Sequence, residues 1–151
     1  MRIVGVPVVI LLASCLPDVP AVGYKCVETS VSIREGFPLK IPFSTPMQGV
    51  YDTELRYRTT DTGQDFKRLE EIAGTAIVES DGHVVQKVEL PRHWIRSESF
   101  SGYYGLVLIR LKSDSAKSYV LTLEITHVPS LLKDTQAVVR VMKVGRKYAA
   151  Q

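Results

Sequence analysis

The fold class is decided by residues 75–90, TAIVESDGHVVQKVEL, in which two apolar runs flank Ser80-Asp81-Gly82. An Asp-Gly pair is preferred in two-residue hairpin turns because both positions take positive φ angles. We therefore predict two antiparallel strands, at residues 75–79 and 83–90, joined by this turn.

The same alternation of apolar and polar side chains recurs on both sides of the hairpin. It predicts further strands at residues 27–33, 37–43, 51–59, 103–111, 119–128 and 137–144. Pro42 lies on the outward face of the strand at 37–43, and proline cannot donate to a ladder, so we expect an edge strand there. The strand at 51–59 should have one solvent-exposed face, which consists of Asp52, Glu54, Arg56 and Arg58.

A single helical pattern interrupts the strands. Asp65 is suited to cap a short helix in which Phe66, Leu69 and Ile72 share a face, and Gly74 stands where such a helix would stop. A helix this short is not stable alone, so we expect it to cover one end of a sheet. Residues 91–102 are predicted to form a long loop.

These elements predict an all-β protein, a single antiparallel β-sandwich of the immunoglobulin-like class with one short helix. About eight short strands with frequent turn signals are typical of a sandwich, and no helices of 10–15 residues separate them. The chain of 151 residues, 45% hydrophobic and 23% charged, suits one globular domain, placed at residues 24–148. The Cys…Trp…Cys spacing of true immunoglobulin domains is absent.

The N-terminal segment has the composition of a targeting signal. Arg2 precedes an uncharged apolar run that is too short to cross a bilayer, which needs about 20 apolar residues. The run ends in Leu12-Ala13-Ser14-Cys15, which resembles the lipobox of bacterial lipoproteins. The resemblance implies that residues 1–14 are a signal peptide, that Cys15 is lipidated, and that residues 15–23 form a tether.

In lipoproteins of this kind, an aspartate directly after the lipidated cysteine retains the protein in the inner membrane. Leu16 stands there instead, so the resemblance implies a periplasm-facing anchor in the outer membrane. Three alternatives stay open: a secretory signal cut after Ala21-Val22-Gly23, a Cys15–Cys26 disulfide, and a translation start upstream. With Cys15 lipidated, Cys26 is expected to be a buried, inert thiol.

A second resemblance covers roughly residues 30–128. The apolar-Pro-Phe strand Ile41-Pro42-Phe43, the short helix before Gly74 and the Tyr-x-Leu-x-Leu strand from Tyr119 look like an uncharacterised family of small proteobacterial lipoproteins. That family has no established activity to carry over.

Sites for catalysis or metals are not evident. Asp61-Thr62-Gly63 matches the aspartic-protease tripeptide, but its neighbours are polar and a second copy is missing, so we interpret it as a turn.

Metal ligands are equally sparse in the sequence. Asp61 and Asp65 supply too few oxygen ligands for calcium. His83, His93 and His127 lack a local ligand spacing, and His127 is predicted to face inward. Because no serine lies in a nucleophile motif, we predict neither an enzyme nor a cofactor.

A binding site is predicted in the loop at Arg92, His93, Trp94 and Arg96. Tryptophan and arginine dominate interface hot spots, and long loops on rigid sheets often carry binding sites. The alternative is that Trp94 folds back to close the core. Nucleic acid is not expected as a partner, because 19 basic and 16 acidic residues leave a net charge of only +3.

Three functions remain as hypotheses. The first is a membrane-tethered, non-catalytic module that binds another protein of the cell envelope. The second is a periplasmic immunity-type inhibitor of an antibacterial toxin. The third is a cell-envelope hydrolase, which the absence of a visible site makes the weakest of the three.

Overall fold

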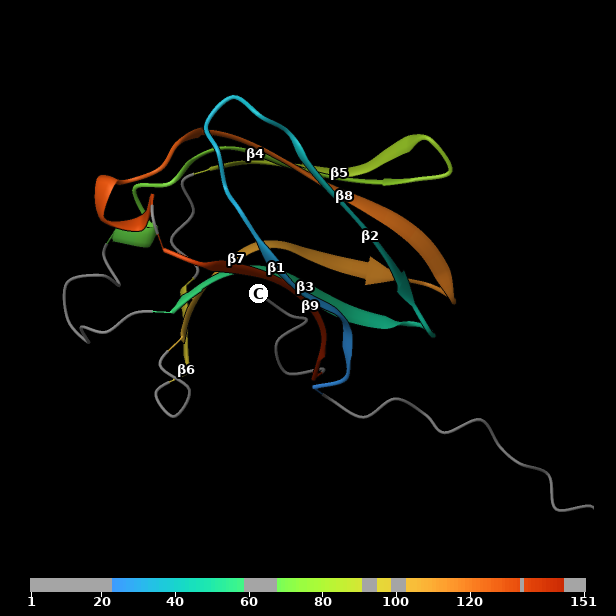
Figure 1. Ribbon diagram of the computed structural model, residues 1–151. Coiled ribbons are helices and arrows are strands. Elements are labelled where there is room, and N and C mark those ends of the chain that lie inside the picture. The colour runs from blue at the N-terminus through green and yellow to red at the C-terminus, as the bar shows by residue number, and fades with distance from the viewer. Residues whose placement is uncertain (1–22, 59–67, 91–94, 99–102, 134, 146–151) are drawn as a thin grey trace, which may run out of the picture.

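The computed structural model describes residues 23–58, 68–90, 95–98, 103–133 and 135–145, and of residues 95–98 only the backbone. These residues form two antiparallel sheets packed face to face (Figure 1), so the prediction of an all-β sandwich is confirmed. The five-stranded sheet has the order β1 (Lys25–Val31), β9 (Ala137–Val144), β3 (Gly49–Arg58), β7 (Tyr103–Ser113) and β6 (Ile95–Glu98). The four-stranded sheet has the order β2 (Leu39–Thr45), β8 (Lys117–His127), β4 (Ala73–Ser80) and β5 (His83–Leu90). A 3-10 turn, η1 (Ser130–Leu132), follows β8.

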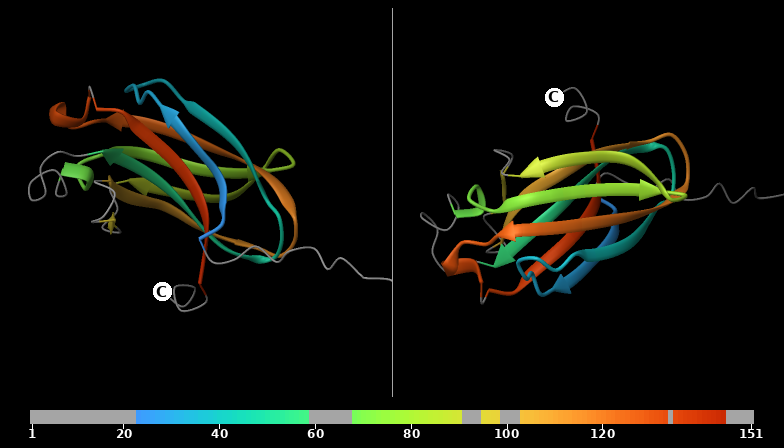
Figure 2. Two further views of the ribbon diagram at one scale, coloured as in Figure 1. Left: turned by 60° about the horizontal axis from the view of Figure 1, so that its bottom comes forward. Right: turned by 90° about the horizontal axis from the view of Figure 1, so that it is seen from above.

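The hairpin that decided the fold class is present as β4 and β5. Asp81 and Gly82 join the two strands with φ angles of 52° and 74°, as an Asp-Gly turn requires. The view from above in Figure 2 looks onto the four-stranded sheet, in which this hairpin forms one side and β2 the other. The prediction that the Pro42 strand lies at an edge is confirmed, since β2 ends the order of its sheet.

The core lies between the two sheets and is built from the inward side chains of both. Tyr51, Leu55 and Tyr57 of β3 are fully buried there, opposite Leu121 and Leu123 of β8. Leu69 and Ile72 are also fully buried, which agrees with the predicted face of the short helix. Arg68 and Leu69 are helical, whereas Asp65 and Phe66 lie outside the described residues.

Gly74 was expected to end that helix, and this prediction is wrong. Gly74 lies inside β4, where its φ angle is +150° and the pairing with β8 shifts register. A Cβ atom on Gly74 would lie 2.2 Å from the backbone oxygen of Glu124. The glycine is therefore needed for the close approach of two backbones at a bulge rather than for a helix end.

The same bulge corrects the expectation for His127. The register shift leaves an extra residue in β8 between Ile125 and His127, which reverses the alternation of side chains beyond it. The His127 side chain is 57% exposed, and Val128 takes the buried position instead.

Two further expectations for the five-stranded sheet are wrong. Residues 91–102 are not all loop, because residues 95–98 form β6. Most of the face of β3 that was expected to contact solvent is buried: Asp52 and Glu54 are fully inaccessible and Arg56 is only 6% exposed, whereas Arg58 at the end of the strand is exposed as expected. The reason is the position of β3 in the middle of its sheet, where β7 and β9 bring arginines to its carboxylates.

Candidate functional site

The predicted binding loop is only partly described by the structure. Arg92, His93 and Trp94 lie outside the described residues, so the orientation of Trp94 stays a prediction. Arg96 belongs to β6 and pairs with Gly105 of β7. The segment thus continues from the predicted loop into a strand of the five-stranded sheet.

The strand β6 stands at the edge of that sheet. It pairs with the beginning of β7, from Ile95 opposite Leu106 to Glu98 opposite Tyr103. Within the described residues no strand pairs with its other side. An edge strand presents backbone N–H and C=O groups to which an extended segment of another protein can add.

Arginine and acidic side chains form a network on the outer face of the same sheet. Arg110 Nε and Nη2 donate to the two carboxylate oxygens of Asp52 at 2.8 and 3.1 Å. Arg140 Nε and Nη2 both donate to Glu54 Oε2, at 3.0 and 2.7 Å. The hydrogen bond from Arg110 to Asp52 raises the pKa of the guanidinium further above its already high usual value.

A third arginine extends this network toward β6. Arg56 lies 3.7 Å from Glu28 of β1, and its guanidinium carbon lies 4.7 Å from the ring centroid of Tyr103. Gly105 pairs with Arg56 on one side and with Arg96 on the other, so a residue without a side chain separates the two arginines. The backbone pairing therefore places Arg56 and Arg96 at corresponding positions on the two sides of Gly105.

Sequence reasoning missed this network. Arg110 and Arg140 are each flanked on both sides by apolar residues within their strands, and that was the signal in the sequence. A lone arginine on a buried strand requires a carboxylate on a neighbouring strand, because an unpaired buried charge is costly. The matching carboxylates, Asp52 and Glu54, alternate with mostly apolar residues in β3, and this pattern was interpreted as a strand with one solvent-exposed face.

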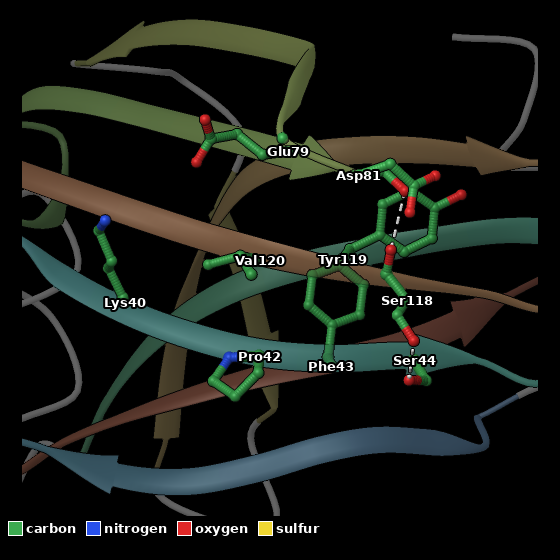
Figure 3. A pocket seen from close by; sticks show the side chains of 11 residues that line it. Lys40, Pro42, Phe43, Ser44, Glu79, Asp81, Ser118, Tyr119 and Val120 are labelled. Atoms are coloured by element: carbon green, nitrogen blue, oxygen red, sulfur yellow. Dashed lines mark hydrogen bonds between the residues drawn. The ribbon is translucent and has the colours of Figure 1, made fainter.

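A groove crosses the outer face of the four-stranded sheet (Figure 3). Its volume is about 530 Å³, and Lys40 and Pro42 of β2, Val120 of β8 and Glu79 of β4 line it. Phe43 and Tyr119 stack beneath it with ring centroids 5.4 Å apart. The hydroxyl groups of Ser44 and Ser118 hydrogen-bond each other at 3.1 Å.

Cys26 is half-buried against the core and is a free thiol. Burial raises the pKa of Cys26 from 9.0 to about 11. Because the thiolate is the nucleophile, a raised pKa makes Cys26 a poor one at neutral pH. Cys15, the predicted lipidation site, lies outside the described residues.

In the part of the chain that the structure describes, no three His, Cys, Asp or Glu side chains are grouped so that they could hold a metal ion. Nor does this part of the chain contain a helix long and apolar enough to cross a membrane.

The two ends of the sandwich differ in what they carry. The Gly23 N–H donates to the Lys143 carbonyl at 2.9 Å, so the chain joins the fold at the end of β9. This end also contains Gly49 and Ser113, which pair where β3 begins and β7 ends. The strand β6 pairs with the opposite end of β7, and the 11 residues of β7 span about 34 Å.

Comparisons with known proteins show the fold alone. No protein-family model matches the chain. No curated protein matches it in sequence either. A crystal structure of a protein from Sulfurospirillum deleyianum is similar in fold, with a TM-score of 0.56 at 9% sequence identity. The match covers 80% of this chain and 99% of that chain.

Proposed function

We propose that this protein is a lipoprotein anchored in the outer membrane by Cys15, and that its sandwich is a non-catalytic binding module for another protein of the cell envelope. The observation that carries the proposal is the place of β6. This edge strand carries Arg96 of the predicted binding segment and pairs with the beginning of β7, whereas Gly23 bonds to Lys143, which is level with the end of β7. A module tethered at one end is best placed to meet a partner at the other.

Recognition at β6 combines backbone and side-chain chemistry. An extended segment of the partner adds to the open edge through main-chain hydrogen bonds, which supply affinity without specifying sequence. Arg96, with Arg92, His93 and Trp94 next to it in the chain, then supplies specificity through forked hydrogen bonds and a large aromatic surface. The Arg56–Tyr103 pair on the neighbouring strands gives that surface a rigid base.

The anchor is tested by intact mass spectrometry of the full chain isolated from membranes. We expect a chain that begins at Cys15 and carries added acyl mass, and we expect a Cys15→Ser variant to lose that mass and keep its signal peptide. An unmodified Cys15, or a soluble chain that begins after Gly23, would show the anchor to be wrong.

The binding surface is tested by site-specific photo-crosslinking in living cells. A crosslinking amino acid at Arg96 or Glu98 of β6 is expected to capture one envelope protein. The matched control is the same amino acid at Val84 of β5, which is the edge strand of the other sheet and is 60% exposed. Capture from β5 and not from β6 would overturn the proposal. Capture of a toxin from β6 would identify an immunity-type inhibitor instead.

A further inference from the structure

A pocket opens at the end of the sandwich where the chain joins the fold. The β2–β3 turn, the β7–β8 turn and the last residues of β9 enclose about 560 Å³. Its apolar lining comes from Met47, Val50 and Val144, and its charged lining from Lys112, Asp114 and Lys143. Two cations and one anion therefore face this space.

The position of Lys143 in this pocket is set by a glycine. A Cβ atom on Gly49 would lie 3.1 Å from Lys143 Cε. The aliphatic part of the lysine side chain therefore packs against the Gly49 backbone, where the side chain of a larger residue would crowd it. Lys143 Nζ also donates to Met47 Sδ at 3.4 Å, which holds the ammonium group at the pocket. Lys112 is exposed on the neighbouring strand end.

The backbone of Lys143 is also the point at which the N-terminal segment attaches. The Gly23 N–H donates to the Lys143 carbonyl, and the Lys143 N–H donates to the Tyr24 carbonyl, both at 2.9 Å. Residues 15–22 can span at most about 29 Å when fully extended. If Cys15 is the anchor, as the proposed function requires, Gly23 is held within that distance of the membrane surface and the pocket lies next to it, beside Lys143.

We propose that this pocket binds the headgroup phosphate of an anionic phospholipid in the anchoring membrane. The ammonium groups of Lys112 and Lys143 supply point charges for the phosphate, and the apolar wall from Met47, Val50 and Val144 contacts the glycerol backbone. The tether raises the local concentration of headgroups at the pocket, so a weak site is occupied. The inference rests on the proposed anchor but concerns a different surface from β6.

The test is lysine reactivity toward an amine-acylating reagent, read by mass spectrometry on the full-length chain purified from membranes. The probes are dihexanoylphosphatidylglycerol, dihexanoylphosphatidylcholine and inorganic phosphate, each as a soluble monomer. We expect the anionic lipid alone to protect Lys112 and Lys143 several-fold. Lys87 of β5 and Lys133, which are 57% and 52% exposed, serve as internal controls and should not be protected.

Variants sharpen the measurement. Lys112→Gln and Lys143→Gln should each weaken binding of the anionic lipid about fivefold, since a lysine near an anionic surface contributes about that factor. Lys87→Gln should leave binding unchanged. Should Lys143→Gln fold poorly, Lys112→Gln still tests the pocket, because its side chain is exposed.

The outcomes separate the pocket from the anchor. Equal protection by inorganic phosphate or by the zwitterionic lipid, or no protection, overturns the headgroup site even if Cys15 proves to be acylated. Protection specific to the anionic lipid supports the site even if the mass of Cys15 shows no acyl group, and then the anchor alone is wrong.

Discussion

At the scale of single residues, Gly74 and Tyr57 show how the local packing determines whether a side chain stabilises the fold. Gly74 allows β4 to approach the backbone of β8 at a bulge, in a conformation with positive φ. Tyr57 is fully buried, and its hydroxyl group has no hydrogen-bond partner in the part of the chain that the structure describes. A side chain at position 74 should therefore destabilise the protein, whereas removal of the Tyr57 hydroxyl group should stabilise it.

Replacing Gly74 with alanine should destabilise the protein by more than about 1 kcal/mol, because the new Cβ atom collides with the Glu124 carbonyl. Urea unfolding followed by circular dichroism measures the loss. Gly36→Ala is the matched control, since Gly36 has φ +77° and nothing lies within 4 Å of an added Cβ. If both variants lose the same stability, the cause is the φ angle and not the contact.

Replacing Tyr57 with phenylalanine should stabilise the protein by about 1 kcal/mol, because a buried hydroxyl without a partner carries an uncompensated desolvation cost.

The pH dependence of the free energy of unfolding gives a second measurement. Burial raises the pKa of Tyr57 from 10.0 to about 12, so its contribution to stability is complete below pH 10 and is lost as pH rises toward 12. The Tyr57→Phe variant should lack this part of the alkaline loss. A variant that is less stable than the wild type at pH 8 would contradict the assignment.

At the scale of elements, β3 is held by charges on one face and by apolar packing on the other. Its inward side chains belong to the core, whereas its outward carboxylates pair with arginines from both neighbouring strands. A buried ion pair is weak evidence for net stability, but removal of one partner leaves a costly charge behind. A strand without an arginine at this position would therefore leave a β3 carboxylate buried without a partner.

Replacing Arg140 with alanine should cost about 3–5 kcal/mol, because it removes both hydrogen bonds to a fully buried carboxylate oxygen of Glu54. Denaturant titration is the measurement. The control is Lys87→Ala, which removes an exposed ion pair with Glu89 and should change stability by less than about 1 kcal/mol. Equal effects in the two variants would mean that the Arg140 pair is not desolvated.

At the scale of the whole molecule, the first and last strands of the fold are neighbours. Lys25 of β1 pairs with Met142 of β9, and β9 in turn pairs with β3. This side of the sheet is thus held together by contacts between residues that are far apart in sequence. The arrangement also places Gly23 and the β6 edge at opposite ends of the strands of this sheet, so a tether that leads to Gly23 would leave β6 open to a partner.

This topology predicts slow folding. Chains dominated by non-local pairings fold in milliseconds to seconds, because the entropy of loop closure is lost before the pairing is gained. Stopped-flow circular dichroism after dilution from urea should show a main refolding phase in that range. A refolding phase completed within microseconds would mean that the β4–β5 hairpin, rather than the β1–β9 and β3–β9 pairings, limits the rate.

The candidate site was predictable only in part. Composition indicated the segment at Arg92, His93, Trp94 and Arg96, because tryptophan and arginine gather in few places in this chain. That Arg96 belongs to an edge strand depends on its pairing with Gly105 of β7, which no local pattern shows. The lysine pocket was not predictable, because Lys112 and Lys143 come from strand ends that meet only in the folded chain.

The sequence by itself determined the strands and their hairpin, because alternation of side chains and the Asp81-Gly82 turn act over a few residues. Only the tertiary structure decided which strands are neighbours. Asp52 and Arg110 are 58 residues apart, and Glu54 and Arg140 are 86 apart. The charged face of β3 is buried because arginines of both neighbouring strands pair with its carboxylates, and local sequence does not specify which strands become neighbours.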